Sequence, residues 1–170
     1  MKKIFLIVAC FLCIAVASHA QKYVIIDTRY ILDKMPEYKA AQTKLDEIAA
    51  NWQKEIDSLQ SQLNKMYKDY DAEQVMLSED LRKKREEQLY DKEKNLHDLQ
   101  RTRFGYEGDL FKKRQELIKP VQDKVYNAVQ RIAAQRGYDL ILDKSEGITV
   151  IFADPKLDKS DDVLRELGIK

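Results

Sequence analysis

The sequence contains few of the two residues that interrupt helices. Its 170 residues include three prolines and five glycines, and neither type occurs between Glu37 and Phe104. Because proline and glycine punctuate nearly every compact fold, an interval of this length predicts very long helices. One continuous helix over these residues would span roughly 100 Å, which is far longer than an ordinary globular domain.

Cysteine is also scarce, and both cysteines lie in an N-terminal segment with the pattern of a secretory signal peptide. A charged start (residues 2–3) precedes an apolar run (4–17) and a small-residue triplet (18–20). The apolar run is too short to span a membrane, and the triplet is typical of a cleavage site. We therefore predict cleavage after Ala20 and a periplasmic or extracellular product. The alternative is a lipoprotein that is lipidated at Cys10.

Removal of this segment leaves a chain with few reactive side chains. The 30 basic residues less Lys2 and Lys3 leave 28, against 29 acidic residues, with no cysteine and one histidine, His97. Disulfides, thiolate zinc sites and Cys–His catalysis are therefore excluded. The sequence also lacks a phosphate-binding loop, a G-x-S-x-G motif and an overall basic field for nucleic acid. We predict a protein that is not an enzyme and needs no cofactor.

Apolar residues recur at helical spacing in the first part of the long interval. Their steps of three and four residues, with one extra step near Trp52, are typical of a coiled-coil arm. The positions are Leu45, Ile48, Trp52, Ile56, Leu59, Leu63, Met66 and Tyr70. We interpret this seam as the surface on which a first helix packs against a second one.

A second helix is expected to begin at about Glu79. Ser78 is a suitable N-cap, and Glu79 and Asp80 place negative charge in the first turn, where the helix dipole favours it. The apolar seam of this helix is thinner, with basic residues at 85 and 92 between Leu81, Leu89, Leu96 and Leu99. The simplest arrangement is an antiparallel hairpin with its tip near residues 74–79.

Three later residues are expected to interrupt or end the returning helix. Gly105 and Gly108 predict either a hinge or a local weak point, because each glycine costs about 1 kcal/mol relative to alanine in a helix. Pro120 predicts a kink or a new helix start. Gly137 is expected to end the helix.

The two ends of the chain have the pattern of β-strands. Short β-type runs occur at residues 23–27, 139–143 and 148–153, and a last helix at about 161–167 is expected to be capped by Ser160 and stopped by Gly168. The strands must meet in a small body. Three short strands rarely close a core alone, so we expect several copies to share one core.

The order of these segments resembles the Skp/OmpH family of periplasmic chaperones. The resemblance covers residues 22–170 and rests on the strand Tyr23–Thr28, the charged hairpin, the helix from Lys119-Pro120 to Arg136-Gly137-Tyr138, and the strand at 139–143. It implies a homotrimer whose three helical arms enclose a cavity. It also implies ATP-independent binding of unfolded outer-membrane proteins before their insertion.

The expected fold is α+β and mostly α. A long antiparallel helical hairpin, a coiled-coil tentacle, is expected to project from a small β-rich trimerisation body. We expect the signal peptide at 1–20, the body at 21–36 and 120–170, and the arm at 37–119. Candidate trimer contacts are Val24, Ile25, Ile26, Leu140, Ile141, Leu142, Val150 and Phe152.

Soft apolar and aromatic side chains near the end of the arm are the candidate contacts for an unfolded client, because they adapt to many partners. They are Met66, Tyr67, Tyr70, Val75, Met76 and Leu77. The alternative is that Met66 and Tyr70 only pack the two helices together, and it is open for residues 75–77 as well.

The charge distribution does not match the strongly basic character of the best-known relatives. Residues 65–100 hold eight basic and ten acidic side chains, whereas residues 101–137 hold nine and four. This balance favours hydrophobic and shape-based holding, and it leaves membrane or lipopolysaccharide contact open. The alternative function is a non-enzymatic coiled-coil scaffold or spacer of the cell envelope.

Overall fold

The structure is a computed structural model that describes residues 21–145 and 150–169. The predicted signal peptide and the alternative lipidation site lie outside the described residues. The chain divides into two compact units. The arm unit is Met35–Lys124, and the body unit combines the described residues up to Lys34 with the described residues from Val125 onward.

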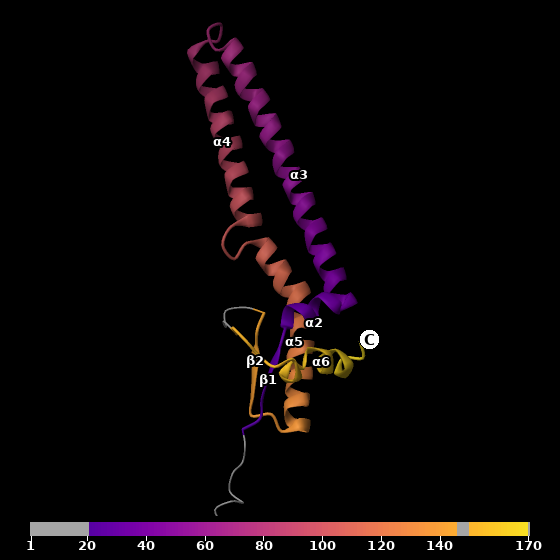
Figure 1. Cartoon of the computed structure of the whole chain (residues 1–170). Coiled ribbons are helices and arrows are strands. Elements are labelled where there is room, and N and C mark those ends of the chain that lie inside the picture. Colours follow the sequence, from indigo (N-terminus) through magenta and orange to yellow (C-terminus); the bar gives the residue numbers. More distant parts are fainter. Residues whose placement is uncertain (1–20, 146–149, 170) are drawn as a thin grey trace, which may run out of the picture. The chain divides into compact units, whose positions relative to one another are not determined.

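The arm unit is built from two long helices that lie side by side as a hairpin (Figure 1). Helix α3 covers Pro36–Glu73 and helix α4 covers Glu79–Phe104. Pro36 occupies the start of α3, where its missing N–H costs nothing. The prediction of very long helices over the interval without proline and glycine is confirmed.

The predicted apolar seam holds the hairpin together. Ile56 and Leu63 of α3 form one buried cluster with Leu89 and Leu96 of α4. Partly buried side chains pack against this cluster, namely Leu59, Met66, Tyr70 and Leu99. One seam residue differs from the prediction, because Leu81 is exposed. It lies in the first turn of α4, beyond Tyr70, the last seam residue that α3 offers to a facing helix.

The tip of the hairpin forms as the capping pattern predicts. The hydroxyl oxygen of Ser78 accepts a hydrogen bond from the backbone N–H of Leu81 at 3.5 Å, and Glu79 and Asp80 lie in the first turn of α4. At the other end of the hairpin, α4 stops at Phe104 and helix α5 begins at Asp109. The two glycines therefore lie in a true break between helices.

Helix α5 covers Asp109–Arg136 and runs without interruption through Pro120. The alternative that Pro120 starts a new helix is therefore wrong. Pro120 and Glu116, whose carbonyl lies one turn earlier, are both exposed, so water can satisfy the carbonyl that proline leaves without a donor. Gly137 ends the helix with a positive φ of 64°, and the N–H of Tyr138 bonds back to the carbonyl of Ala133.

The body unit contains a two-stranded parallel sheet. Strand β1 (Tyr23–Ile26) pairs with strand β2 (Leu140–Asp143), so that Tyr23 lies opposite Leu140 and Ile26 opposite Asp143. These strands confirm two of the three predicted β-runs. The remaining elements are helix α2 (Thr28–Lys34), the 3-10 helix η1 (Pro155–Leu157) and helix α6 (Ser160–Glu166).

The third predicted strand is wrong for the residues of 148–153 that the structure describes. Residues 150–153 have no strand pairing, and residues 148 and 149 lie outside the described ranges. On the edge of β1 away from β2, the backbone contact is an isolated bridge from Ile25 to Asp158. The segment 150–153 therefore does not add to the sheet beside β1, where Asp158 makes the contact.

The end of the chain differs from the prediction in how its helix starts. The N-cap of α6 is Lys159, without a side-chain hydrogen bond, and Ser160 is the first helical residue rather than the cap. The Ser160 hydroxyl instead accepts from the backbone N–H of Asp27 at 2.8 Å and donates to the Asp158 carboxylate at 2.6 Å. Gly168, with φ 76°, stops the helix as predicted.

Helix α2 was not predicted, and local capping explains it. The Asp27 carboxylate accepts a hydrogen bond from the backbone N–H of Tyr30 at 2.9 Å, which is N-cap geometry. Ile31 on this helix is completely buried. The buried apolar side chains of the body come from β1, α2, α5 and α6, and they are Val24, Ile25, Ile26, Ile31, Val125, Ala128, Ile132, Val163 and Leu164.

Among the described residues, no helix combines the length and the apolar character that crossing a membrane requires.

Candidate functional site

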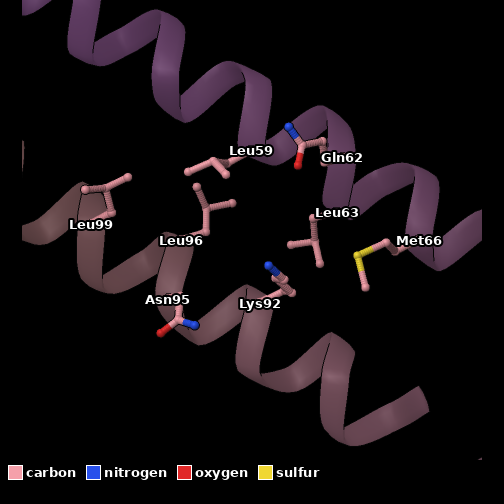
Figure 2. A pocket seen from close by; sticks show the side chains of 8 residues that line it. All are labelled: Leu59, Gln62, Leu63, Met66, Lys92, Asn95, Leu96 and Leu99. Carbon is pink, nitrogen blue, oxygen red and sulfur yellow. The ribbon is translucent and has the colours of Figure 1, made fainter.

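The first part of the candidate site is an apolar groove between α3 and α4. Its lining comes from both helices, and Figure 2 shows Leu59 and Leu63 of α3 facing Leu96 of α4. Lys92 extends its amine into the space between the helices, next to Leu63. The groove exists because the thin seam of α4 has a lysine where a second apolar side chain would close the packing.

Met66 borders this groove and packs, like Tyr70, against the buried cluster of the arm. The two tyrosine candidates also link the helices through hydrogen bonds. The hydroxyl of Tyr67 donates to the Glu93 carboxylate at 2.9 Å, and the hydroxyl of Tyr70 donates to Glu86. These bonds to carboxylates, together with partial burial, raise the pKa of both tyrosines above the ordinary value.

The tip presents the remaining candidates differently. Val75 is 86% exposed and Met76 is 82% exposed, whereas Leu77 is half-buried. The backbone of this turn is held in place by a bond from the Gln74 N–H to the Tyr70 carbonyl at 2.8 Å, and by the Arg82 guanidinium, which donates to the Gln74 carbonyl at 3.1 Å. An ordered turn therefore carries two apolar side chains in solvent.

The structure thus separates five of the six candidate client contacts into two groups, and the sixth, Leu77, is half-buried in the turn between α3 and α4. Met66 and Tyr70 pack the hairpin, and Tyr67 bonds across it with its ring at the surface. Val75 and Met76 contribute little to that packing. A free apolar surface of the arm lies at the tip, at residues 75–76 (defined here as the tip patch).

Sequence reasoning missed a second structured feature of the arm, which surrounds Arg103. Its guanidinium lies 4.6 Å from the centre of the Trp52 ring, 2.8 Å from the Asp109 carboxylate and 3.9 Å from the Glu55 carboxylate. Phe104 meets the Trp52 ring edge to face, with ring centres 6.3 Å apart. The sequence did contain one signal for this feature. Trp52 lies in the apolar seam at the extra step, which indicated that the packing of the two helices changes there.

The candidate trimer contacts also divide by burial. Val24, Ile25 and Ile26 are buried within the single chain. Ile141, Leu142 and Val150 are half-buried, and Leu140 is exposed. Phe152 and its neighbour Ile151 are 84% and 94% exposed. Ile151 is missing from the predicted contacts, although it lies in the β-type run that contains Val150 and Phe152.

A hydrogen-bond network fixes the strand ends of the body. Asp143 accepts from the backbone N–H groups of Thr28 at 3.1 Å and Ser145 at 3.0 Å, and from the Thr28 hydroxyl. Burial alone would raise the pKa of Asp143, but these bonds outweigh it and lower the pKa. The pKa of Asp158 is lowered in the same way, because bonds from Lys144 and Ser160 outweigh its burial.

No group of three or more His, Cys, Asp or Glu side chains in the described parts of the chain is placed to hold a metal ion. His97 lies 3.9 Å from the Glu93 carboxylate on the surface of α4, with most of its side chain exposed.

The fold places this chain in a class of proteins that combine a helical hairpin arm with a small body containing a parallel sheet. Residues 22–167 match the family described as outer membrane protein (OmpH-like). The chain therefore belongs to the OmpH/Skp family of outer-membrane-chaperone-like proteins, as its sequence suggests. The family is one of chaperones and not of enzymes, in agreement with the prediction of a non-enzymatic protein.

A solved structure has the same fold. It is the crystal structure of a candidate outer membrane chaperone (OmpH-like) from Caulobacter crescentus CB15, which matches with a TM-score of 0.70 and 17% sequence identity. The match covers 89% of this chain and 86% of that one. The comparison with curated proteins gave no match.

Proposed function

We propose that the protein is an ATP-independent holdase of the periplasm, which binds unfolded outer-membrane proteins and prevents their aggregation before insertion. The observation that carries this proposal is the tip patch, an exposed apolar pair on an ordered turn at the end of a hairpin in an OmpH-like chain. Apolar strands of an unfolded membrane protein aggregate unless they are covered. Soft side chains cover them reversibly, without nucleotide.

The working form that we propose is a homotrimer whose three arms enclose the client. Two four-residue strands form the only sheet in the described chain, and Leu140, Ile151 and Phe152 stay exposed on the same unit. Covering such side chains with sister copies would bury apolar surface that the single chain leaves in solvent. Several weak arms acting on one client then bind it tightly, through a high effective concentration.

The holdase proposal is tested by dilution of a urea-denatured outer-membrane protein into buffer without nucleotide. The intact protein at a stoichiometric amount of trimer should suppress light scattering. The double variant Val75→Asp with Met76→Asp should suppress it less, because it places charge on the two exposed side chains of the tip patch. A matched control is Gln60→Asp with Gln88→Asp, which adds the same charge at exposed positions of α3 and α4 and should behave like the parent.

Absence of suppression by the parent would favour the alternative, a scaffold or spacer of the envelope. The trimer is tested separately by sedimentation of Leu142→Asp and Leu140→Asp. Both variants should yield monomers, with helix content unchanged by circular dichroism for the exposed position 140. If they stay trimeric, the arms hold the assembly instead of the strands.

A further inference from the structure

The break between α4 and α5 leaves its backbone little freedom. A side-chain carbon added at Gly105 would lie 2.3 Å from the backbone oxygen of Arg101, and one added at Gly108 would lie 2.8 Å from that of Thr102. Side-chain carbons do not come this close to backbone atoms, so the turn requires glycine at both positions. Backbone hydrogen bonds close the turn, from the N–H of Gly105 to Arg101 at 2.8 Å and from the N–H of Gly108 to Gly105 at 2.9 Å.

Arg103 ties this break to the neighbouring helices. From the last turn of α4, its guanidinium donates to the Asp109 carboxylate at the start of α5 at 2.8 Å, and it lies 4.6 Å from the centre of the Trp52 ring on α3. The Glu55 carboxylate of α3 lies 3.9 Å from the same guanidinium. The side chains of Arg103 and Asp109 are 28% and 30% exposed, so water and salt screen this ion pair less than a surface pair. One side chain therefore links three helices.

Two features of the same turn work against the closed arrangement. Glu107 has a positive φ of 53°, which side chains rarely adopt, and among the described residues it is the one non-glycine position with such a backbone. The Nε of Arg103 is buried and has no hydrogen-bond partner in the described parts of the chain. This costs free energy that water would recover if the turn opened. Strain of this kind persists only where surrounding contacts impose it, and it is found in switch regions.

The helix that enters this turn is also the weaker side of the arm. Helix α3 continues unbroken beside the break, whereas α4 has a thin seam whose buried side chains are Leu89 and Leu96. The last turn of α4 contacts Trp52 through the Arg103 guanidinium and through Phe104, whose ring meets the Trp52 ring edge to face at 6.3 Å. Loss of these contacts would free the end of α4 while the buried cluster of the arm stays packed.

We propose that Arg103 is a latch of the arm. Its contacts with Trp52 and Asp109 keep a strained turn closed, and their release lets the end of α4 separate locally from α3. The latch is a property of the arm itself and does not depend on the proposed holdase function. It makes the two glycines part of a local weak point that side-chain contacts hold closed, and not of a free hinge. The arm then has a closed and an open state at this break, with the open state reached without unfolding of the whole unit.

Amide hydrogen exchange followed by mass spectrometry measures the opening directly. In the parent, residues 101–109 should exchange faster than the segments around Leu63 and Leu89, because they open while the seam stays packed. Arg103→Gln should speed the exchange of residues 101–109 by about three- to tenfold, the range expected for the loss of one partly exposed, charged hydrogen bond. Exchange around Leu63 and Leu89 should stay at the parent's rate.

Trp52 reports the same opening by fluorescence, because it is the one tryptophan of the chain. Arg103→Gln should raise the quenching of this fluorescence by acrylamide, since the ring loses the guanidinium that lies over it. Arg103→Lys should recover part of the parent's protection, because lysine keeps the charge but lacks a planar face to lie on the ring. The matched control is Arg101→Gln, which removes an exposed ion pair with Asp98 on α4 and should change neither fluorescence nor exchange.

Relief of the backbone strain tests the latch from the other side. Glycine adopts a positive φ without steric cost, so Glu107→Gly should slow the exchange of residues 101–109. In a double variant, Glu107→Gly should also offset part of the faster exchange caused by Arg103→Gln. A latch that holds a strained turn predicts both results, whereas a turn without strain predicts neither.

The outcomes decide between a latch and ordinary packing. Parent exchange at residues 101–109 as slow as at the seam would overturn the latch, because the turn would then open only together with the arm. Equal changes in Arg103→Gln and Arg101→Gln would overturn it as well. If Arg103→Gln lowers the helix content of the whole protein, Glu107→Gly still decides, because unchanged or faster exchange in that variant contradicts a strained turn.

Discussion

The arm and the body bury their apolar side chains in different ways. In the arm, the buried cluster joins two helices through a seam one or two side chains wide, and a groove opens beside Leu63. In the body, segments from both ends of the chain combine, and β1 pairs with a strand more than a hundred residues later. The arm therefore depends on contacts between turns that face each other, and the body depends on long-range closure.

This difference shows how the chain divides stability and function. A narrow seam leaves most of each arm helix in solvent, where side chains are free to contact another chain. A closed body fixes its segments through buried side chains and bonds such as that from Asp27 to Ser160. Truncation of one buried side chain should therefore destabilise the arm only near that side chain, whereas in the body it should destabilise the whole unit.

The largest expected effect is on the body core. Ile31→Ala removes a side chain with 0% exposure and should lower the free energy of unfolding by about 2–5 kcal/mol. Leu63→Ala in the arm should cost about 2 kcal/mol, at the low end of that range, because the adjacent groove already admits water. Urea denaturation at one protein concentration measures both. Leu81→Ala, at an exposed seam position, is the control, and equal costs at positions 31 and 63 would contradict the comparison.

A smaller effect is expected from acid, and it should fall on the body. The folded-state pKa values of Asp143 and Asp158 are lowered below the unfolded value of about 3.9. Their hydrogen bonds therefore stabilise the body fully above this value, and the contribution is lost as the pH falls through the folded-state pKa. Thermal unfolding between pH 7 and pH 3 should show this loss.

Asp143→Asn tests the same contribution without a change of pH. The variant should destabilise the protein by about 1–3 kcal/mol at pH 7, because an amide accepts the bonds from Thr28 and Ser145 less strongly, and it should flatten the acid dependence. A variant with the parent's full dependence on pH would show that other carboxylates control it. Asp91→Asn, on the exposed surface of α4, is the matched control.

The smallest effect is expected at the surface of the arm. Tyr67→Phe removes the hydroxyl that donates to Glu93 and should cost no more than about 1 kcal/mol, since the bond is exposed to water. Thermal unfolding of Tyr67→Phe and of Tyr90→Phe measures the difference, because the hydroxyl of Tyr90 makes no such bond to the described residues. A larger cost would mean that cross-helix hydrogen bonds, and not the apolar seam, hold the arm.

Local patterns in the sequence predicted the elements whose causes are local. The interval without proline and glycine predicted α3 and α4, Ser78 predicted the start of α4, and Gly137 and Gly168 predicted two helix ends. Each of these signals acts within one or two helical turns. The periodicity of apolar residues predicted the packing of the seam in the same way. Leu81 is the exception, because it would be buried only if a turn of α3 with an apolar side chain lay opposite it.

Tertiary structure decided the features that depend on residues far apart in the sequence. Residues 150–153 have strand-like composition, but they pair with neither strand of the sheet, and the far edge of β1 contacts Asp158 instead. Ser160 is chemically a good cap, yet its hydroxyl bonds to Asp27 and Asp158 instead. Local sequence patterns determined that this chain forms a long helical hairpin, because helix formation is local. Which apolar side chains stay in solvent was settled only by packing, because burial depends on what lies opposite.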